Sequence, residues 1–259
     1  MLEALGRGWR VLATGFCFLV FGLGGMVMRC LVYPLLSLCV RDPQRRVAWS
    51  QKIIHYSFRA FVGLMAAAQV LTYEVRGHER LRRRGLLVLA NHPSLIDVVF
   101  LISLIRHMDC IVKDALVRNA FTRGPIMAAG FIANNAGAGL VADCMRSLGA
   151  GNNLIIFPEG TRTPLHGPPV RLQRGAANVA VRGGFDITPV HIHCTLPMLT
   201  KGTPWWQVPQ RRPHFTIEVR EDIAIAPFVA QAASEALAAR AVTEHLSDQL
   251  FKKASRVST

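Results

Sequence analysis

The stretch LLVLANHPSLID at positions 86–97 decides how the rest of the chain is interpreted. Its first four residues, Leu86 to Leu89, are a short apolar run typical of a buried strand, and Pro93-Ser94 indicate the start of a helix. His92 is therefore expected at the carboxyl end of a strand, where open α/β sheets bind their substrates. Ser94 is a good N-cap, and Asp97 stands at the capping-box position, which turns its carboxylate toward His92. The stretch predicts a base and its orienting carboxylate within one turn.

Strand and helix patterns alternate along the rest of the chain. The passage 124–139 is rich in glycine and small residues, so it is expected to be mostly turns around one strand near Phe131. The alternation predicts an α/β fold with a mixed, largely parallel sheet flanked by helices. Further strands are expected at 110–113, 154–157, 187–193 and 214–219, and helices at 98–107, 141–148, 174–182 and 230–251.

The N-terminal segment holds much of the chain's excess of apolar residues. The mean hydropathy of the chain is +0.29. An uncharged run from Val11 to Met28 is long enough to cross a hydrocarbon core at about 1.5 Å per residue. No small-residue cleavage pattern follows it, so it predicts an uncleaved anchor. A second run, Cys30 to Val40, contains Pro34 and is a continuation, a kink or a re-entrant piece. A buried helix hairpin of a soluble protein is the alternative.

Residues 56–70 are helical in pattern and lie either in the membrane interface or on the catalytic domain. We therefore divide the chain into a membrane anchor with interfacial helices at 1–70 and a catalytic domain at 71–259. The positive-inside rule favours a catalytic domain that faces the cytoplasm of a bacterial-type inner membrane. The residues behind this orientation are Arg41, Arg45, Arg46 and Lys52, which outnumber Arg7 and Arg10.

The chain carries a formal net charge of +14, which implies an anionic partner. Nucleic acid is disfavoured, because the basic residues are dispersed and no helix-turn-helix or zinc-finger spacing occurs. An anionic membrane surface accounts for both the charge and the apolar N-terminus. The basic turn Arg76 to Arg84 is either a solvated loop or a contact for anionic headgroups.

The six cysteines form no CxxC pair, so they indicate reduced thiols in a reducing compartment. His191, His193 and Cys194 are conceivable metal ligands. Alternation along a strand, however, sends the two histidines to one face and Cys194 to the other. No metal site is therefore expected.

A second strand end carries polar residues at 158–163, with the sequence PEGTRT. General-base catalysis on a hydroxyl needs an imidazole that a carboxylate holds in one tautomer, and His92 with Asp97 would supply it. The chain has no GxSxG elbow and no cysteine beside a histidine in a comparable turn, so the attacking hydroxyl is expected to belong to the substrate. Arg162 suits a phosphate or carboxylate, or else forms a surface ion pair.

Two of these segments resemble a known family. Residues 91–97, NHPSLID, and 157–162, FPEGTR, resemble the first and third motifs of the lysophospholipid acyltransferases related to 1-acylglycerol-3-phosphate acyltransferase. The resemblance covers roughly Tyr73 to Val219 and implies a glycerolipid acyltransferase-like α/β fold. Three further positions match the family: Lys113 after the first motif's helix, Arg174-Gly175-Ala176 as its basic-Gly-Ala segment, and Ile187 to Val190, with Pro189, as its fourth motif.

The resemblance implies direct acyl transfer from acyl coenzyme A or acyl carrier protein to the hydroxyl of a lysolipid, with no cofactor besides the thioester co-substrate. His92 would take the hydroxyl proton while Asp97 fixes the imidazole, and Lys113 would stand near backbone N–H groups that meet the oxyanion. The acceptor site would consist of Glu159, Gly160, Thr161 and Arg162, with Arg162 on the anionic group, supported by Arg174, Gly175 and Pro189.

One departure from the family pattern leaves the acceptor open. The second motif usually finishes with an arginine that helps to hold the acceptor phosphate, whereas residues 130–135 here end in Asn134-Asn135. Arg118 and Arg123 are candidate substitutes. The acceptor is then lysophosphatidic acid-like, another lysolipid, an amino-acid lipid or a hydroxyl of a specialised lipid or polyene pathway. The other hypotheses are a catalytically idle, membrane-lipid-binding homologue and, third, a nucleic-acid binder.

Overall fold

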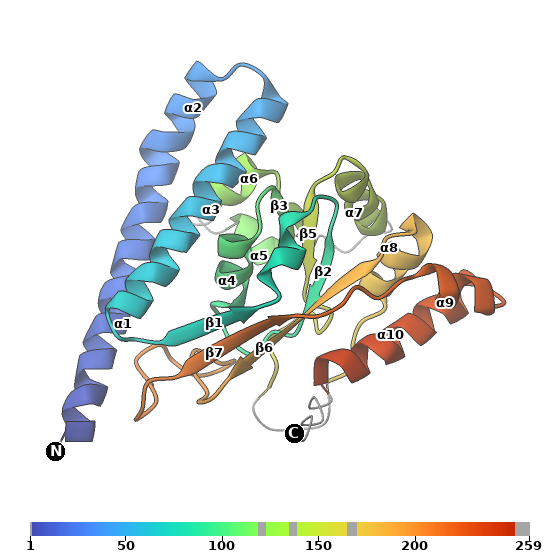
Figure 1. The fold of residues 1–259 in the computed structure, drawn as a ribbon. Coiled ribbons are helices and arrows are strands. Elements are labelled where there is room, and N and C mark those ends of the chain that lie inside the picture. Colours follow the sequence, from blue (N-terminus) through green and yellow to red (C-terminus); the bar gives the residue numbers. More distant parts are fainter. Residues whose placement is uncertain (1, 119–122, 135–138, 165–169, 252–259) are drawn as a thin grey trace.

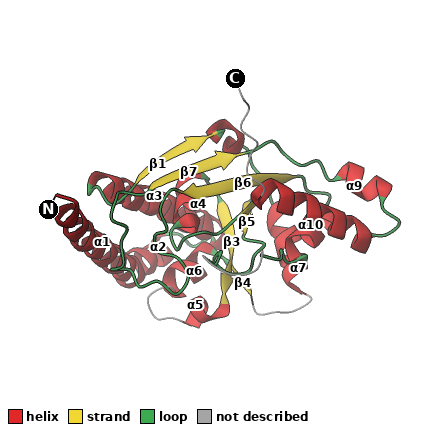
Figure 2. Cartoon of the chain, turned by 90° about the horizontal axis from the view of Figure 1, so that it is seen from below, coloured by secondary structure: helices red, strands yellow, loops and turns green. Residues whose placement is uncertain are grey.

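The computed structural model describes residues 2–118, 123–134, 139–164 and 170–251, and its centre is a seven-stranded sheet (Figure 2). The strand order is β1-β7-β6-β2-β5-β3-β4, and only β6 and β7 pair in antiparallel fashion. This confirms the predicted mixed, largely parallel sheet. The strands are β1 (Thr72–Arg76), β2 (Leu87–Ala90), β3 (Met108–Lys113), β4 (Ile132–Asn134), β5 (Asn153–Ile156), β6 (Ile187–Cys194) and β7 (His214–Val219).

Helices cover both faces of the sheet (Figures 1 and 2). One face packs against α3 (Pro43–Ala67), α4 (Asp97–Leu104) and α6 (Arg123–Ala129), and the other against α7 (Gly139–Gly149), α8 (Gly175–Gly183) and α10 (Glu235–Phe251). Alternate residues of β2 serve the two cores: Val88 and Ala90 belong to the first, Leu87 and Leu89 to the second. Burial on both sides explains why this strand is an unbroken apolar run.

The N-terminal helices form a hairpin beside the sheet (Figure 1). Helix α1 (Leu2–Val27) continues through a π-helical turn, η1 (Met28–Val32), into α2 (Tyr33–Cys39). The second apolar run is thus a continuation of the first. The π turn precedes Pro34, which cannot donate a backbone hydrogen bond to an α-helical ladder. By length and composition alone the helical stretch Gly6–Cys39 could cross a membrane, and 17% of its most apolar window is buried.

Helix α3 returns alongside α1 and packs on the catalytic domain. Its Gln51 side chain donates hydrogen bonds to Asp109 (2.6 Å) and to the carbonyl of Ala129 (3.1 Å). His55 Nδ1 donates to the carbonyls of Ile102 (2.7 Å) and Ile105 (3.1 Å) at the end of α4. The predicted helix 56–70 is the second half of α3.

Three local predictions were wrong. Residues 123–129 form α6 rather than turns, because Ile126 and Ala129 pack into the core. The expected helix 230–251 is interrupted: α9 (Ala226–Gln231) ends at an extended Ala232, and Ser234 accepts the first backbone hydrogen bonds of α10. The helix after His92 begins at Asp97 instead of Pro93-Ser94, since the Ser94 side chain binds the Asp97 carboxylate.

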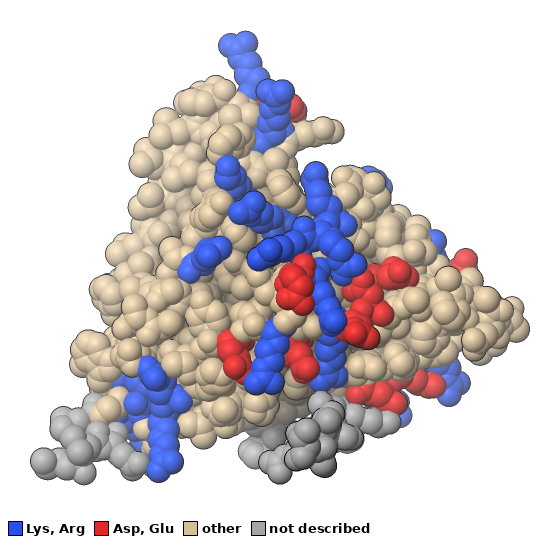
Figure 3. Space-filling model, in the orientation of Figure 1, with Lys and Arg blue, Asp and Glu red and all other residues tan. Residues whose placement is uncertain are grey.

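Two short elements were not predicted from the sequence. β1 alternates charged and apolar residues and pairs only at the edge, parallel to β7. The short helix α5 (Asp114–Arg118) is the other, whereas the 3₁₀ turn η2 (His78–Arg82) lies within the predicted basic turn at 76–84. On the face seen in Figure 3, Lys and Arg side chains crowd the middle of the surface, and a separate group lies beside the N-terminal end of the chain.

Candidate active site

The two polar strand ends meet at one edge of the sheet. β2 and β5 are parallel neighbours, with Leu87 beside Leu154. Just beyond their carboxyl ends, the backbone N–H of His92 donates to Glu159 Oε1 (2.8 Å), and the carbonyl of His92 accepts from the Thr163 N–H (2.7 Å). The backbone of His92 is thus held on both sides by the turn 158–163.

His92 and Asp97 form a hydrogen-bonded pair. Nδ1 of His92 lies 2.9 Å from Asp97 Oδ2, and the same carboxylate accepts hydrogen bonds from the N–H (2.6 Å) and the hydroxyl of Ser94. Burial raises the pKa of Asp97, and the hydrogen bonds from His92 and Ser94 oppose that shift. The carboxylate fixes the proton on Nδ1, which makes Nε2 the nitrogen able to accept a proton.

Phe157 and Asn91 complete the support of His92, and the sequence interpretation missed both roles. The Phe157 ring stacks on the imidazole with centroids 4.1 Å apart and an interplanar angle of 22°. The Asn91 amide exchanges two hydrogen bonds with the backbone of Ile192, which joins the end of β2 to β6. The side chain of His92 remains 18% exposed. The imidazole of His92 is therefore held in one orientation and is still accessible.

Glu159 lies inside the site rather than on its surface. It is 4% exposed, and Oε1 accepts hydrogen bonds from His92 and from the Thr163 hydroxyl (2.9 Å). Oε2 is buried and has no hydrogen-bond partner within the part of the chain that the structure describes. Burial raises the pKa of Glu159, and the two hydrogen bonds oppose the shift. This geometry makes Glu159 a brace for the backbone of His92.

Arg162 is anchored to the loop after β6. Its Nη1 donates to the carbonyls of Leu199 and Thr200, each at 3.0 Å, so one of the three guanidinium nitrogens is engaged. Leu199 adopts a left-handed backbone with φ of 54°, a strained conformation for a leucine. Gly160 also has a positive φ, 66°, and a Cβ there would lie 2.7 Å from Gln173 Nε2. Thr161 is half-buried in the same turn.

The other predicted residues lie farther from the imidazole. Lys113, exposed at the end of β3, stands beside Asn134 in the register of β3 and β4. β3 is separated from β2 by β5, so Lys113 shares the edge of the sheet with His92 but lies two strand spacings away, about 10 Å. Arg118 forms an ion pair with Asp114, and Arg123 begins α6.

Arg174 and Gly175 begin α8, and the preceding Gln173 N–H donates to the carbonyl of Pro158 (2.8 Å). α8 therefore starts beside the turn 158–163. Pro189 pairs with Leu89 in the centre of the sheet, where proline is unusual. Proline has no backbone N–H to donate. At this position the β6–β7 pairing contains a bulge, with one extra residue between Val219 and Ile223, so no hydrogen bond from residue 189 is required.

A cavity of about 230 Å³ opens beside the turn at 91–97. Cys194 lines it with an Sγ that donates to the Leu196 carbonyl (2.9 Å), and burial raises the pKa of this thiol to about 12. Within the described residues no group of three His, Cys, Asp or Glu side chains could hold a metal ion. The remaining lining is Asn91, Pro93, Ser94, Thr163, Pro164, His191, Ile192, His193, Pro197, Met198, Thr200, Leu250 and Phe251.

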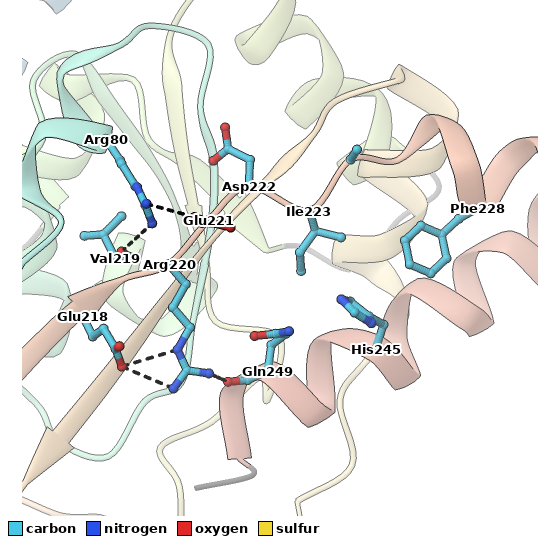
Figure 4. A pocket seen from close by; sticks show the side chains of 11 residues that line it. Arg80, Glu218, Val219, Arg220, Glu221, Asp222, Ile223, Phe228, His245 and Gln249 are labelled. Atoms are coloured by element: carbon cyan, nitrogen blue, oxygen red, sulfur yellow. Dashed lines mark hydrogen bonds and ion pairs between the residues drawn. The ribbon is translucent and has the colours of Figure 1, made fainter. Parts of the chain in front are cut away.

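A larger cavity, about 580 Å³, lies elsewhere (Figure 4). It surrounds the end of β7, which runs antiparallel to β6 and so finishes beside the start of β6, away from the edge that holds His92. Its charged side chains pair with one another: Arg80 with Glu221 (3.4 Å) and Arg220 with Glu218 (3.3 Å). His245 and Gln249 of α10 form its opposite wall.

Comparison with known proteins defines the class. Residues 72–193 match the family model described as Acyltransferase, which includes β1 to β6 and both motif turns. This match agrees with the resemblance of the two motifs and makes the segment similar to acyltransferase domains.

Two similar proteins have names that specify the reaction more closely than the family model does. The chain is 26% identical over 129 residues to a 1-acyl-sn-glycerol-3-phosphate acyltransferase of Pseudomonas aeruginosa, a match that covers 46% of this chain and about half of the relative, 49% of its length. It shares its fold with the crystal structure of the 1-acyl-sn-glycerophosphate acyltransferase from Thermotoga maritima, at a TM-score of 0.70 and 21% identity, covering 98% of this chain and all of the other.

Proposed function

We propose that the chain is a membrane-bound O-acyltransferase that moves a fatty acyl group from acyl coenzyme A or acyl carrier protein to the hydroxyl of a lysolipid. The observation that supports this most strongly is the accessible His92, which is bound to a buried Asp97 and braced by Glu159 and Thr163. In the proposed step Nε2 of His92 takes the hydroxyl proton, the acceptor oxygen bonds to the thioester carbon, and the C–S bond breaks. The thiolate leaves and takes up the proton from His92.

The nucleophile in this proposal comes from the acceptor, since neighbouring side chains suit that role poorly. The Ser94 hydroxyl donates to Asp97 rather than to the imidazole. The Cys194 thiol has a pKa raised to about 12 by burial, so it would carry almost no thiolate near neutral pH. Both observations favour direct transfer without an acyl-enzyme.

The acceptor is expected to carry an anionic group near Arg162. Its guanidinium is held by two backbone carbonyls through Nη1, and among the described residues no hydrogen bond engages Nε or Nη2, so that edge could make a bidentate contact with phosphate or carboxylate. Lysophosphatidic acid is the first candidate, because both relatives named above act on a glycerol phosphate according to their names.

A different acceptor is the second candidate, and Asn134 is the observation that favours it. It ends β4 beside Lys113, at a position where the family pattern has an arginine. A lysolipid with a smaller or different polar group, an amino-acid lipid or a specialised hydroxyl acceptor would need fewer cations there.

Membrane attachment in this proposal rests on α1 and α2. Most large apolar side chains of these helices face outward, among them Leu12, Phe16, Leu19, Leu35 and Leu38. Such a surface is costly in water and suited to lipid. The basic residues after α2 favour a cytoplasmic catalytic domain.

An acceptor screen by mass spectrometry tests the proposal. The full chain would be incubated with acyl coenzyme A or acyl carrier protein and a panel of lysolipids, with His92→Ala as the matched control. We expect an acylated product with the native protein alone. Turnover that persists in the His92 variant would contradict the mechanism, and no product from any acceptor, with lipid binding retained, would favour the catalytically idle homologue.

A further inference from the structure

The loop between β6 and β7, residues 195–213 and hereafter the Trp loop, packs on α1. A Cβ at Gly15 would lie 3.1 Å from the Trp205 ring, and Phe18 meets that ring edge-on with centroids 6.4 Å apart. One and a half turns earlier, Nη2 of Arg10 donates to the carbonyls of Pro209 (3.2 Å) and Gln210. The Trp loop is thus fixed against the first half of the apolar helix.

This contact places two exposed tryptophans beside exposed apolar residues of α1. Trp205 is 42% exposed and Trp206 56%, and their rings meet edge-on at 5.6 Å. Leu12 and Leu19 point within about 60° of Gly15 around the helix axis, at 100° per residue, and are largely exposed. Lipid that covered these leucines would therefore also reach Trp206.

The charge of this region matches an anionic membrane surface. No Asp or Glu occurs between positions 4 and 41 or between positions 187 and 213. Lys201, Arg211 and Arg212 are exposed in the Trp loop, and Arg7 is exposed on α1. A group of Lys and Arg side chains lies beside the N-terminal end of the chain in Figure 3. Tryptophan flanked by basic residues is typical of the lipid–water interface.

The same loop reaches the catalytic turn. The carbonyl of Leu199 accepts hydrogen bonds from the Leu95 N–H (3.0 Å) and from Arg162. The carbonyl of Thr200 accepts a second hydrogen bond from Arg162. Leu95 follows Ser94 in the turn that carries His92 and Asp97. The Trp loop therefore connects the exposed tryptophans to the residues that orient the base.

We propose that the Trp loop is a second lipid-contacting element: Trp206 inserts into the interface of an anionic bilayer, and the loop holds the His92 turn at that surface through Leu199 and Thr200. A lysolipid hydroxyl lies at this depth, so the acceptor would reach Nε2 without leaving the membrane. The inference rests on the membrane attachment proposed above and names the element that sets the height of the site.

Fluorescence of a single-tryptophan variant tests the insertion. The full chain with Trp9→Phe, Trp49→Phe and Trp205→Phe keeps Trp206 alone and preserves an aromatic ring against Phe18. It would be mixed with phosphatidylcholine–phosphatidylglycerol vesicles, with and without acyl-chain bromine. We expect a blue shift of the emission and quenching by the brominated lipid. If the chain sediments with vesicles but Trp206 is neither shifted nor quenched, the inference alone is overturned. If the chain does not sediment, the proposed membrane attachment fails as well.

A kinetic comparison separates lipid contact from a structural role. Trp206→Ala should weaken vesicle binding about tenfold, corresponding to about 1.4 kcal/mol. It should lower transfer to a vesicle-embedded acceptor by a similar factor, and leave transfer to a detergent-dispersed acceptor within about twofold. Leu237→Ala removes a side chain 52% exposed on α10 and should change none of these values. Equal losses of Trp206→Ala on both acceptors would show a structural role and overturn the inference.

Discussion

The two cavities described above differ in what the polar groups in and beside them do. In the larger, about 580 Å³, arginines and acids neutralise one another in pairs around the end of β7 (Figure 4). Beside the smaller, about 230 Å³, two motif turns hold one histidine: Asp97 binds the imidazole of His92, and Glu159 accepts from its backbone N–H. Volume alone would select the wrong place. Convergence on a group that can exchange a proton is the better criterion for chemistry.

Two histidines show the same contrast, His92 next to the smaller cavity and His245 in the wall of the larger one. His92 and His245 each lie against a phenylalanine, with ring centroids 4.1 Å apart for His92–Phe157 and 5.5 Å for His245–Phe228. Only His92 of this pair has a buried carboxylate on its Nδ1. His245 is exposed on α10 and stands among groups that already balance one another.

The largest effect should come from exchanging these histidines one at a time. We expect His92→Ala to lower acyl transfer by about 10³-fold or more, since general-base catalysis contributes about 10²–10⁴-fold. His245→Ala should leave the rate within about twofold. Initial rates with a fixed donor would measure both, and thermal melts would confirm that each variant folds. Comparable losses in both variants would erase the distinction between the cavities.

Asp97→Asn should have the next largest effect, a loss of about 10²-fold in transfer. The amide keeps the volume but no longer holds the proton on Nδ1 of His92, and it places an NH₂ group where Ser94 and His92 donate. Asp222→Asn, at the edge of the larger cavity, is the matched control and should leave the rate within about twofold. Measured rates that fall equally would show that Asp97 matters only for folding.

Arg162→Lys should raise the KM for a phosphate-bearing acceptor about tenfold, because a lysine ammonium cannot make the bidentate contact. The KM for the acyl donor should stay unchanged. Arg80→Lys in the larger cavity is the control and should change neither constant. Steady-state kinetics over a range of acceptor concentrations decides this, and a loss confined to kcat would contradict acceptor binding by Arg162.

Lowering the pH should change the contributions of Glu159 and Asp222 to the free energy of unfolding in opposite directions. Burial raises the pKa of Glu159 in the folded protein. Ionised Glu159 therefore lowers the free energy of unfolding when the pH is above that raised pKa. This destabilisation disappears when the pH is below the usual pKa range of glutamate. Although burial opposes it, hydrogen bonds from Arg83 and Thr188 lower the pKa of Asp222, whose contribution is present at neutral pH and lost as the pH falls through the lowered value.

Denaturant unfolding at pH 7 and pH 4 would measure this contrast. Relative to the native chain, Glu159→Gln should gain unfolding free energy at pH 7 compared with pH 4, and Asp222→Asn should lose it. A shift of equal sign in the two variants would contradict the assignment of their electrostatic environments.

The motif turns and the largely parallel sheet could be predicted from the sequence, because continuous apolar runs and polar residues at strand ends are local signals. His92, Asp97 and the meeting of residues 91–97 with 157–162 followed from them. The stacking of Phe157, the amide bridge of Asn91 and the burial of Glu159 depend on contacts across strands and could not be read from spacing. The edge strand β1 and the attachment of the Trp loop to α1 likewise exist only in the assembled fold.

Direct transfer through the His92–Asp97 base is the central claim, and the intact mass of the protein tests it most directly. The 28.5 kDa chain would be mixed with an acyl thioester in the absence of acceptor, quenched in acid within one turnover time and weighed by mass spectrometry. We expect the unmodified mass, and acylated lipid only once acceptor is added. A mass increased by one acyl group, and restored when acceptor follows, would contradict the account.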